Sequence, residues 1–328
     1  MSKRVLLTGA SGFIGSHVLK RILEQTDWEV VCLSTFTHHG IQDRIAEVVQ
    51  DFSRVKVIIS DLASPISDIT SKSIGKIDYV INVASESHVD RSIQNPTPFI
   101  LNNVALICNL LDWARANPVE KFLHVSTDEV YGPYQHRANV EWDPHLPSNP
   151  YSASKAAQED IAFAYWRTYD IPIIITNTMN VIGEMQHVEK FTPLVIKKIV
   201  NDETITIHSS NGVVGVRDWL YVGNQASALL HILSLPVSRA SESSKPDRWN
   251  ISGDVRYSNL EWAEIISNII GKSFSYNIVD SSISRPGYDH QYMLNNEKLL
   301  LSGWNPPYDI DKAIEDTVKW YLNHRDWL

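Results

Sequence analysis

The stretch VLLTGASGFIG, residues 5–15, decides the fold of this chain. Its first residues predict a short buried strand, and the glycine turn that follows leads into an amphipathic helix predicted over residues 13–24. Gly9 permits a tight turn, Gly12 lets a ligand approach the backbone at the helix N-terminus, and Gly15 allows the helix to pack closely on the sheet. This strand, turn and helix predict the first βα unit of a dinucleotide-binding sheet.

Beyond this unit, short β-branched runs alternate with longer amphipathic stretches along the first half of the chain. The alternation predicts an α/β fold, a doubly wound parallel Rossmann sheet whose strands are apolar because helices cover both faces. Predicted strands lie at 4–7, 29–33, 55–59, 79–83, 121–125 and 173–176, and two further helices at 99–116 and 152–169.

The alternation breaks after about residue 177, where single helices are separated by irregular segments rich in Pro, Gly and Trp. We predict an NAD- or NADP-binding Rossmann domain over residues 1–177, with returning segments near 204–235, and a smaller, mainly substrate-binding α/β unit over 178–328. Helices are expected at 193–200, 260–270 and 310–323, and residues 238–247 are expected to form an exposed loop.

Composition excludes several classes of partner. The net charge of the 328 residues is -9, with no block of Lys or Arg, so a nucleic-acid partner is not expected. No apolar run of about 18 residues and no export signal is present, so neither a membrane span nor secretion is expected. Cys32 and Cys108 lie in apolar runs and predict unpaired thiols in a reducing, cytoplasmic compartment. The histidines show no metal-ligand spacing, so no metal is predicted.

The end of the second predicted strand bears on the choice between NAD and NADP. An acid there normally hydrogen-bonds the adenosine ribose, but this chain has Ser34. Serine can bond one ribose hydroxyl without repelling a 2'-phosphate, and no Arg follows directly, so the sequence leaves the choice open. Asp61, after the third strand, is either a partner for the adenine amino group or a helix N-cap.

The fifth predicted strand delivers the segment STDEVYG, residues 126–132, to the carboxyl end of the sheet, where such folds bind ligands. An isolated pair such as Asp128 and Glu129 is more often a solvated strand end. Downstream, however, Tyr151 and Lys155 occupy positions i and i+4 on one face of a helix. A nearby ammonium is expected to lower the pKa of the Tyr151 phenol, so that it accepts a proton from a substrate hydroxyl during hydride transfer.

At these residues the chain resembles the extended short-chain dehydrogenase/reductase family and, within it, the dTDP-glucose 4,6-dehydratases, whose STDEVYG segment it carries unchanged. Similar strings are ESHVDRS at 86–92, NPY at 149–151, TMNVIGEMQHVEK at 178–190, RDW at 217–219, NI at 250–251 and RPGYD at 285–289. The resemblance implies an NAD-dependent lyase that acts on dTDP- or UDP-glucose. It also implies a homodimer paired through the helices at 99–116 and 152–169.

The resemblance implies a role for each catalytic candidate. Tyr151 accepts the O4 proton as hydride leaves C4 for the nicotinamide, and Lys155 tunes this phenol and reaches the nicotinamide ribose. Glu129 then removes the C5 proton, and Asp128 protonates the departing C6 hydroxyl before the hydride returns to C6. Of two close, partly buried carboxyls, one is expected to be protonated and the other ionised, here Asp128 and Glu129 respectively. Thr127 is expected to hydrogen-bond O4.

The binding candidates complete the expected site. Cofactor candidates are Gly9, Gly12, Phe13, Ile14, Gly15, Ser34, Asp61, Leu62, Ala84, Tyr151 and Lys155. Substrate candidates are Ser87, Thr127, Asn180, Glu189, Lys190, Arg217, Asn250, Arg285 and Tyr288, with the two arginines suited to a diphosphate. His88 is interpreted as a buried supporting group.

Several segments depart from the family pattern, namely 182–188, 208–215 and Tyr288, and they leave the base and the sugar open. Alternatives are a UDP-N-acetylglucosamine dehydratase, or an epimerase or decarboxylase of nucleotide sugars on the same fold. Asp128 and Glu129 argue against the last two, because neither reaction expels a C6 hydroxyl. A rival from another class is a non-catalytic cofactor sensor, against which Thr127, Tyr151 and Lys155 argue.

Overall fold

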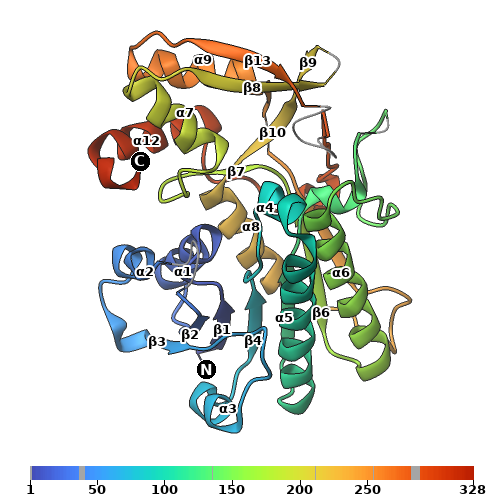
Figure 1. Ribbon diagram of the computed structural model, residues 1–328. Coiled ribbons are helices and arrows are strands. Elements are labelled where there is room, and N and C mark those ends of the chain that lie inside the picture. Colours follow the sequence, from blue (N-terminus) through green and yellow to red (C-terminus); the bar gives the residue numbers. More distant parts are fainter. Residues whose placement is uncertain (1, 37–40, 135, 211, 254, 282–288) are drawn as a thin grey trace.

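A seven-stranded parallel sheet organises the computed structural model, which describes residues 2–36, 41–134, 136–210, 212–253, 255–281 and 289–328 (Figure 1). The strand order is β11-β6-β5-β4-β1-β2-β3. The strands are β1 (Arg4–Thr8), β2 (Glu29–Ser34), β3 (Val55–Ile59), β4 (Tyr79–Asn82), β5 (Lys121–Val125), β6 (Ile173–Thr178) and β11 (Asp247–Ile251). The predicted doubly wound Rossmann sheet is confirmed.

Helices cover both faces of this sheet, which explains why its strands are apolar on both sides. Val5 and Leu7 of β1 face one core, whereas Leu6 between them faces the other. The first core is covered by α1 (Phe13–Gln25), α2 (Gln42–Val48) and α8 (Val222–Ser234). The second is covered by α3 (Asp68–Ile74), α5 (Pro96–Ala116) and α6 (Pro150–Tyr169).

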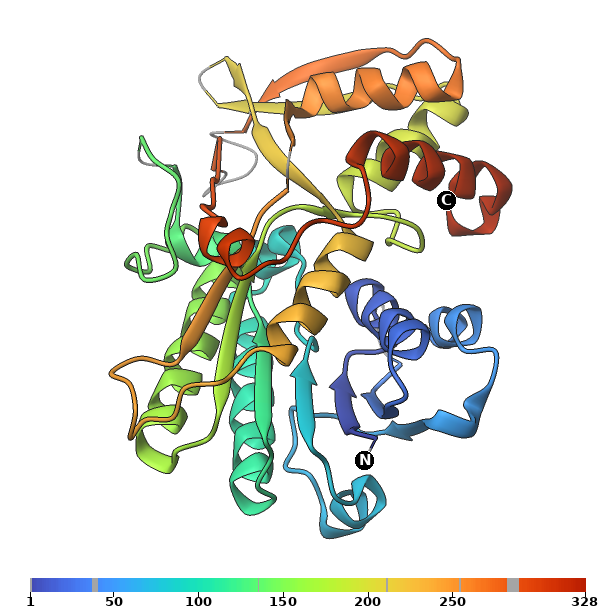
Figure 2. The same ribbon diagram turned by 180° about the vertical axis from the view of Figure 1, so that it is seen from behind.

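The second half of the chain builds a smaller lobe above the carboxyl ends of the large sheet (Figures 1 and 2). Its two sheets have the orders β12-β10-β7 and β13-β8-β9. These strands are β7 (Val181–Ile182), β8 (Ile205–Ser210), β9 (Val213–Val214), β10 (Val216–Tyr221), β12 (Val255–Ser258) and β13 (Tyr276–Asp280). Helices α7 (Phe191–Val200), α9 (Asn259–Ile270) and α12 (Ile310–Asn323) pack on them. Trp219 and Trp262 stack at 4.4 Å inside this core.

The chain crosses between the two lobes more often than a boundary at residue 177 implies. Of the segment 204–235 that we expected to return, only α8 lies on the large sheet, while β8 and β10 belong to the small lobe. A second return lies beyond that segment, because β11 pairs in parallel with β6 as the seventh strand. The cause is packing: one face of α8, including Leu229 and Leu233, is apolar and buried, and Trp249 and Ile251 of β11 lie in the same core.

Among the described residues, no helix has the length and apolar character that a membrane span requires. Cys32 and Cys108 are free thiols, with Cys32 buried and Cys108 half-buried.

Candidate active site

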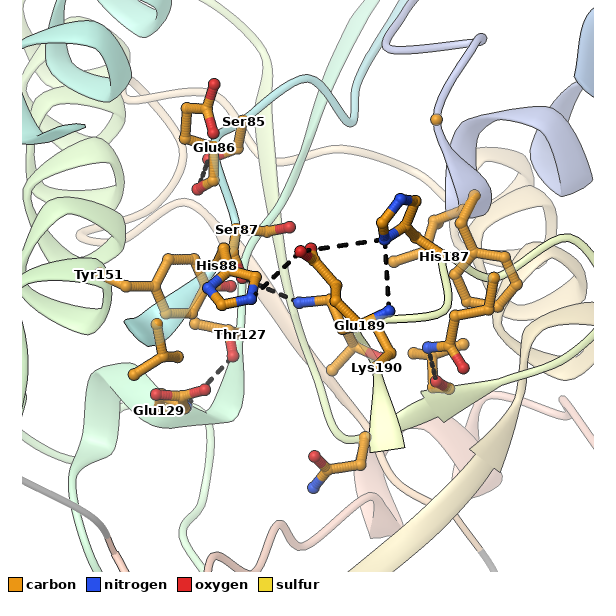
Figure 3. A pocket seen from close by; sticks show the side chains of 18 of the residues that line it. Ser85, Glu86, Ser87, His88, Thr127, Glu129, Tyr151, His187, Glu189 and Lys190 are labelled. Carbon is orange, nitrogen blue, oxygen red and sulfur yellow. Dashed lines mark hydrogen bonds and ion pairs between the residues drawn. The ribbon is translucent and has the colours of Figure 1, made fainter. Parts of the chain in front are cut away.

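A cavity of about 1010 Å³ lies between the carboxyl ends of the large sheet and the small lobe. This volume is at the upper end of the range for small-molecule sites and suits two ligands side by side. Figure 3 shows Thr127, Glu129 and Tyr151 on one side, His187, Glu189 and Lys190 opposite them, and His88 between the two groups. All cofactor candidates predicted from the sequence line this cavity.

The glycine turn forms the part of the wall where α1 begins. Gly9 has φ +72°, and a Cβ there would lie 2.9 Å from the Ala84 backbone nitrogen. At Gly15 a Cβ would lie 2.0 Å from the Gly9 carbonyl oxygen, so no larger residue fits. The described first turn of α1 carries no acidic residue. The free backbone amides at a helix N-terminus stabilise a bound anion. The turn therefore fits the pyrophosphate of a dinucleotide.

Next along this wall are the residues expected near the adenosine. The Ser34 hydroxyl accepts a hydrogen bond from the Ser11 amide at 3.4 Å. Asp61 does not cap a helix, because Ser67 caps α3; its Oδ1 accepts instead from the Ala63 amide at 2.9 Å. Arg44 was not predicted, yet its buried guanidinium lines the cavity and donates to the Ser11 carbonyl at 3.1 Å. Nothing in the pattern of residues 42–48 pointed to it.

The catalytic candidates meet directly after β5. A short 3-10 turn, η2 (Asp128–Tyr131), follows Thr127, whose hydroxyl donates to Asp128 Oδ1 at 3.0 Å. The Asn149 side chain caps α6 and also donates to Glu129 Oε2 at 3.0 Å. Because α6 begins there, Tyr151 projects into the same end of the cavity (Figure 3). The structure thus brings both carboxyls and the phenol together.

The two carboxyls have different surroundings. Asp128 is buried, and burial together with the charge of Glu129 raises the pKa of its carboxyl to about 8. A carboxyl of this kind is protonated at neutral pH and can donate a proton. The expectation that Asp128 serves as an acid thus has an electrostatic cause in the structure.

Burial is the largest influence on the pKa values of both Tyr151 and Lys155. Burial and the charge of Glu129 raise the pKa of Tyr151 above its ordinary value. The Lys155 ammonium donates to the Val125 carbonyl at 2.9 Å. Burial lowers the pKa of Lys155 to about 7. Burial thus opposes the lowering of the Tyr151 pKa that we expect from Lys155, and that lowering stays a prediction.

These pKa values predict an alkaline limit to activity. Asp128 and Lys155 are both needed in the protonated form, with pKa values of about 8 and about 7. We therefore expect kcat/KM to fall as pH rises from 7 to 8, since each required proton is lost in that direction. Initial rates across a pH series measure this, with a thermal melt at each pH as the control for stability. A rate that stays level beyond pH 9 would contradict both assignments.

Most substrate candidates also line the cavity. These are Ser87, Thr127, Asn180, Glu189, Lys190 and Arg217. The Lys190 ammonium donates to the Ser87 carbonyl at 3.1 Å. The Arg217 guanidinium donates to the backbone carbonyls of Val216, His290 and Asp289 and lies over the Tyr292 ring. The positive charge of Arg217 also acts on the Asp128 carboxyl and lowers its pKa, against the larger effect of burial. Arg217, from β10 of the small lobe, therefore lies close enough to the catalytic pair for its charge to act there.

Asn250 does not join this group. It is fully buried in β11, and its amide donates to the carbonyls of Asn139 and Asn295 while accepting from the Tyr131 hydroxyl. The side chain thus joins three chain segments and does not line the cavity. The other two candidates, Arg285 and Tyr288, lie outside the described residues.

A histidine pair that the sequence did not single out as functional faces the cavity. His88 caps α4 (Val89–Gln94), and its Nε2 lies 3.2 Å from Glu189 Oε2. His187 Nδ1 lies 3.8 Å from the same carboxylate oxygen (Figure 3). Glu189 therefore contacts both rings. No group of three or more potential metal ligands occurs within the part of the chain that the structure describes.

Comparisons with known proteins give matches that cover most of the chain. The model of the NAD dependent epimerase/dehydratase family matches residues 5–252. The chain is 34% identical over 341 residues to the dTDP-glucose 4,6-dehydratase of Haemophilus influenzae, covering 97% of both proteins. It is 34% identical over 318 residues to the low-salt glycan biosynthesis protein Agl12 of Haloferax volcanii, covering 97% of this chain and 98% of that protein. The structure of DesIV, a dTDP-glucose 4,6-dehydratase from Streptomyces venezuelae with NAD bound, matches with a TM-score of 0.89 at 30% identity, covering 99% of this chain and 98% of DesIV.

Proposed function

The chain belongs to the NAD dependent epimerase/dehydratase family, and from that premise we propose that it is a nucleoside-diphosphate-glucose 4,6-dehydratase. The substrate is dTDP- or UDP-glucose, and the product is the 4-keto-6-deoxy sugar. One observation carries this choice: a buried Asp128 with a pKa of about 8 beside Glu129, next to Tyr151. A pair of carboxyls, one protonated, is what elimination of water requires.

Each catalytic side chain has one task at a stated atom. The Tyr151 phenolic oxygen accepts the O4 proton, and the Thr127 hydroxyl orients O4. Oxidation at C4 acidifies the C5 proton, which a Glu129 carboxylate oxygen removes. Asp128 then donates its proton to the C6 hydroxyl, which leaves as water. Arg217 and Lys190 neutralise the diphosphate, and the surrounding burial of Asp128 keeps bulk water from this proton.

NAD is the cofactor that the glycine turn and the family support. The groups that would hold it are the turn at Gly9, Gly12 and Gly15, the amides of Phe13 and Ile14, and Ser34, Asp61, Leu62 and Ala84. When bound, NAD supplies a positive charge that favours the Tyr151 phenolate, takes hydride from C4 and returns hydride to C6. Lys155, on α6, would contact the nicotinamide ribose.

Ser34 makes the preference for NAD over NADP a matter for test. We expect Ser34→Asp to increase the ratio of NAD to NADP affinity by about tenfold or more, because a carboxylate there would repel a 2'-phosphate. Isothermal titration of both cofactors into cofactor-free protein measures this. Ser34→Ala is the control, since it removes the hydroxyl without adding charge and should leave the ratio unchanged. An unchanged ratio in Ser34→Asp would place the ribose elsewhere.

The runner-up is another reaction of this family, either dehydration of UDP-N-acetylglucosamine or C4 epimerisation. The segments 182–188 and 208–215 differ from the family pattern where sugar and base would lie, which keeps the first alternative open. An epimerase does not expel a C6 hydroxyl and has no use for a protonated Asp128.

A panel of nucleotide sugars separates these functions. The purified protein is incubated with dTDP-glucose, UDP-glucose and UDP-N-acetylglucosamine, and the products are separated by liquid chromatography and identified by mass spectrometry. Loss of one water from either glucose nucleotide supports the proposal. Water loss from UDP-N-acetylglucosamine alone supports the runner-up, an isomer of equal mass supports an epimerase, and the absence of any product refutes enzymatic action on these sugars.

We further infer that the protein works as a homodimer in the cytoplasm. Helices α5 and α6 pack together and carry exposed apolar side chains, with Leu101 63% and Tyr169 44% exposed. The free thiols of Cys32 and Cys108 suit a reducing compartment. Light scattering on the purified protein tests the dimer, and a Leu101→Glu variant should shift it towards the monomer.

A further inference from the structure

A buried ion pair joins α6 to β11 behind η2, the turn that carries Asp128 and Glu129 and is called the catalytic turn below. Glu159 and Arg248 are both about 2% exposed, and Arg248 Nη2 lies 2.5 Å from Glu159 Oε2. His145 Nε2 approaches the same oxygen at 3.2 Å. A buried ion pair contributes little net stability, because desolvation of the charges offsets their attraction. The position of this pair therefore calls for an explanation beyond stability.

One chain of contacts leads from the pair to the catalytic turn. The Asn177 amide donates to Glu159 Oε1 at 2.7 Å and to the Thr127 carbonyl at 2.9 Å. Arg248 Nε donates to Asn177 Oδ1 at 2.9 Å, so both the nitrogen and the oxygen of this side-chain amide are hydrogen-bonded. Thr127 in turn donates to Asp128. The ion pair thus orients the backbone from which the acid projects.

A second link is electrostatic and runs along α6. Glu159 lies one turn after Lys155, and both side chains are buried. Burial alone would raise the pKa of Glu159, but the charge of Arg248 and the hydrogen bond of His145 hold it at about 2. Burial lowers the pKa of Lys155, and the charge of Glu159 opposes this.

Other groups near Lys155 do not take over this role. Tyr151 lies on the same helix, His124 faces it from β5, and Asp128 and Glu129 lie on η2. Burial lowers the pKa of His124 well below its ordinary value, so this ring is neutral. Asp128 is protonated at neutral pH. Among the described groups, Glu159 is the carboxylate whose charge acts on Lys155.

We propose that Glu159 is a positioning residue of the reaction centre. It orients Thr127 through Asn177, and its negative charge stabilises the ammonium form of Lys155. Arg248 keeps Glu159 ionised. The inference rests on the proposed dehydratase only for its turnover readout, because the charge state of Lys155 is measurable on the protein alone.

Glu159→Gln tests the proposal while keeping shape and hydrogen-bonding atoms. We expect the alkaline limit of kcat to move down by about one pH unit, because an opposite charge near Lys155 is lost. At pH 8 kcat should fall about tenfold, while KM for the nucleotide sugar changes less than about threefold, since the residue does not line the cavity. Glu159→Asp keeps the charge and should restore most of the pH profile.

Asp160→Asn is the matched control. Asp160 neighbours Glu159 on α6, is 72% exposed, and contacts the other ring nitrogen of His145 at 3.3 Å. If the loss came only from loosening His145, this variant would reproduce it. We expect both its pH profile and its kcat to match those of the unaltered protein.

A titration of the Lys155 side chain decides the electrostatic part without turnover. Protein labelled with ¹³C at lysine Cε is titrated by NMR, and the Lys155 signal is identified by its loss in Lys155→Met. The midpoint should fall in Glu159→Gln and stay in place in Asp160→Asn. If Glu159→Gln does not fold, Arg248→Met serves instead, because Glu159 then takes up a proton and the Lys155 midpoint should also fall. An unchanged Lys155 midpoint in the folded variant overturns the proposal, and it does so whether or not any nucleotide sugar is turned over.

Discussion

Asp128→Asn should slow water loss by about 10²- to 10⁴-fold while leaving C4 oxidation almost intact. The amide keeps the shape of the carboxyl in its buried setting but has no acidic proton to give to the C6 hydroxyl. The 4-keto, 6-hydroxy sugar and reduced cofactor should therefore accumulate together. Stopped-flow absorbance of the reduced nicotinamide detects the second, and mass spectrometry of the quenched sugar detects the first.

Asp68→Asn provides the control for this experiment, because Asp68 lies in the exposed first turn of α3. Its rate should equal that of the unaltered protein. Dehydration by Asp128→Asn at a normal rate would show that the proton comes from another group.

Tyr151→Phe should abolish turnover, with a loss of about 10³-fold or more, because no group then accepts the O4 proton. In contrast to Asp128→Asn, no reduced cofactor should appear, since the reaction stops before oxidation. The ring of Tyr151 packs edge-on against Phe99 with centroids 6.3 Å apart, and phenylalanine keeps this contact. The same stopped-flow assay therefore separates the two steps.

Tyr165→Phe is matched to it on the same helix. The Tyr165 hydroxyl donates to Asp112 at the surface, far from the catalytic turn, so its loss should leave turnover unchanged. Substantial oxidation by Tyr151→Phe would mean that Thr127 or a water molecule serves as the base.

The first half of the fold could be predicted from sequence because its signals are local. Strands β3 and β5 were predicted at their observed bounds, since short runs rich in Val, Ile, Leu and Phe indicate strands. The place of Asp128 and Glu129 followed from the same logic, because residues directly after a parallel strand face the ligand edge of the sheet.

The remainder depended on contacts between distant segments. Residues 247–251 carry too little pattern to predict that β11 pairs with β6. Asn250 was assigned to the substrate by resemblance, yet its amide is taken up by two backbone carbonyls. Arg44 reaches the cavity only because the Ser11 and Met185 carbonyls meet at its guanidinium. The direction of the Tyr151 pKa shift depends on burial, which spacing along a helix does not report.

The late return of the chain to the large sheet has a consequence during synthesis. A nascent chain that has reached residue 178 already contains six of the seven strands, but the side of β6 that β11 will occupy is bare. The apolar face of α1 also waits for α8, which packs on it. An open strand edge and an uncovered apolar face are sites of aggregation. Fragments that stop before residue 251 should therefore associate with one another rather than fold, and the two lobes cannot be separated by cutting the chain once.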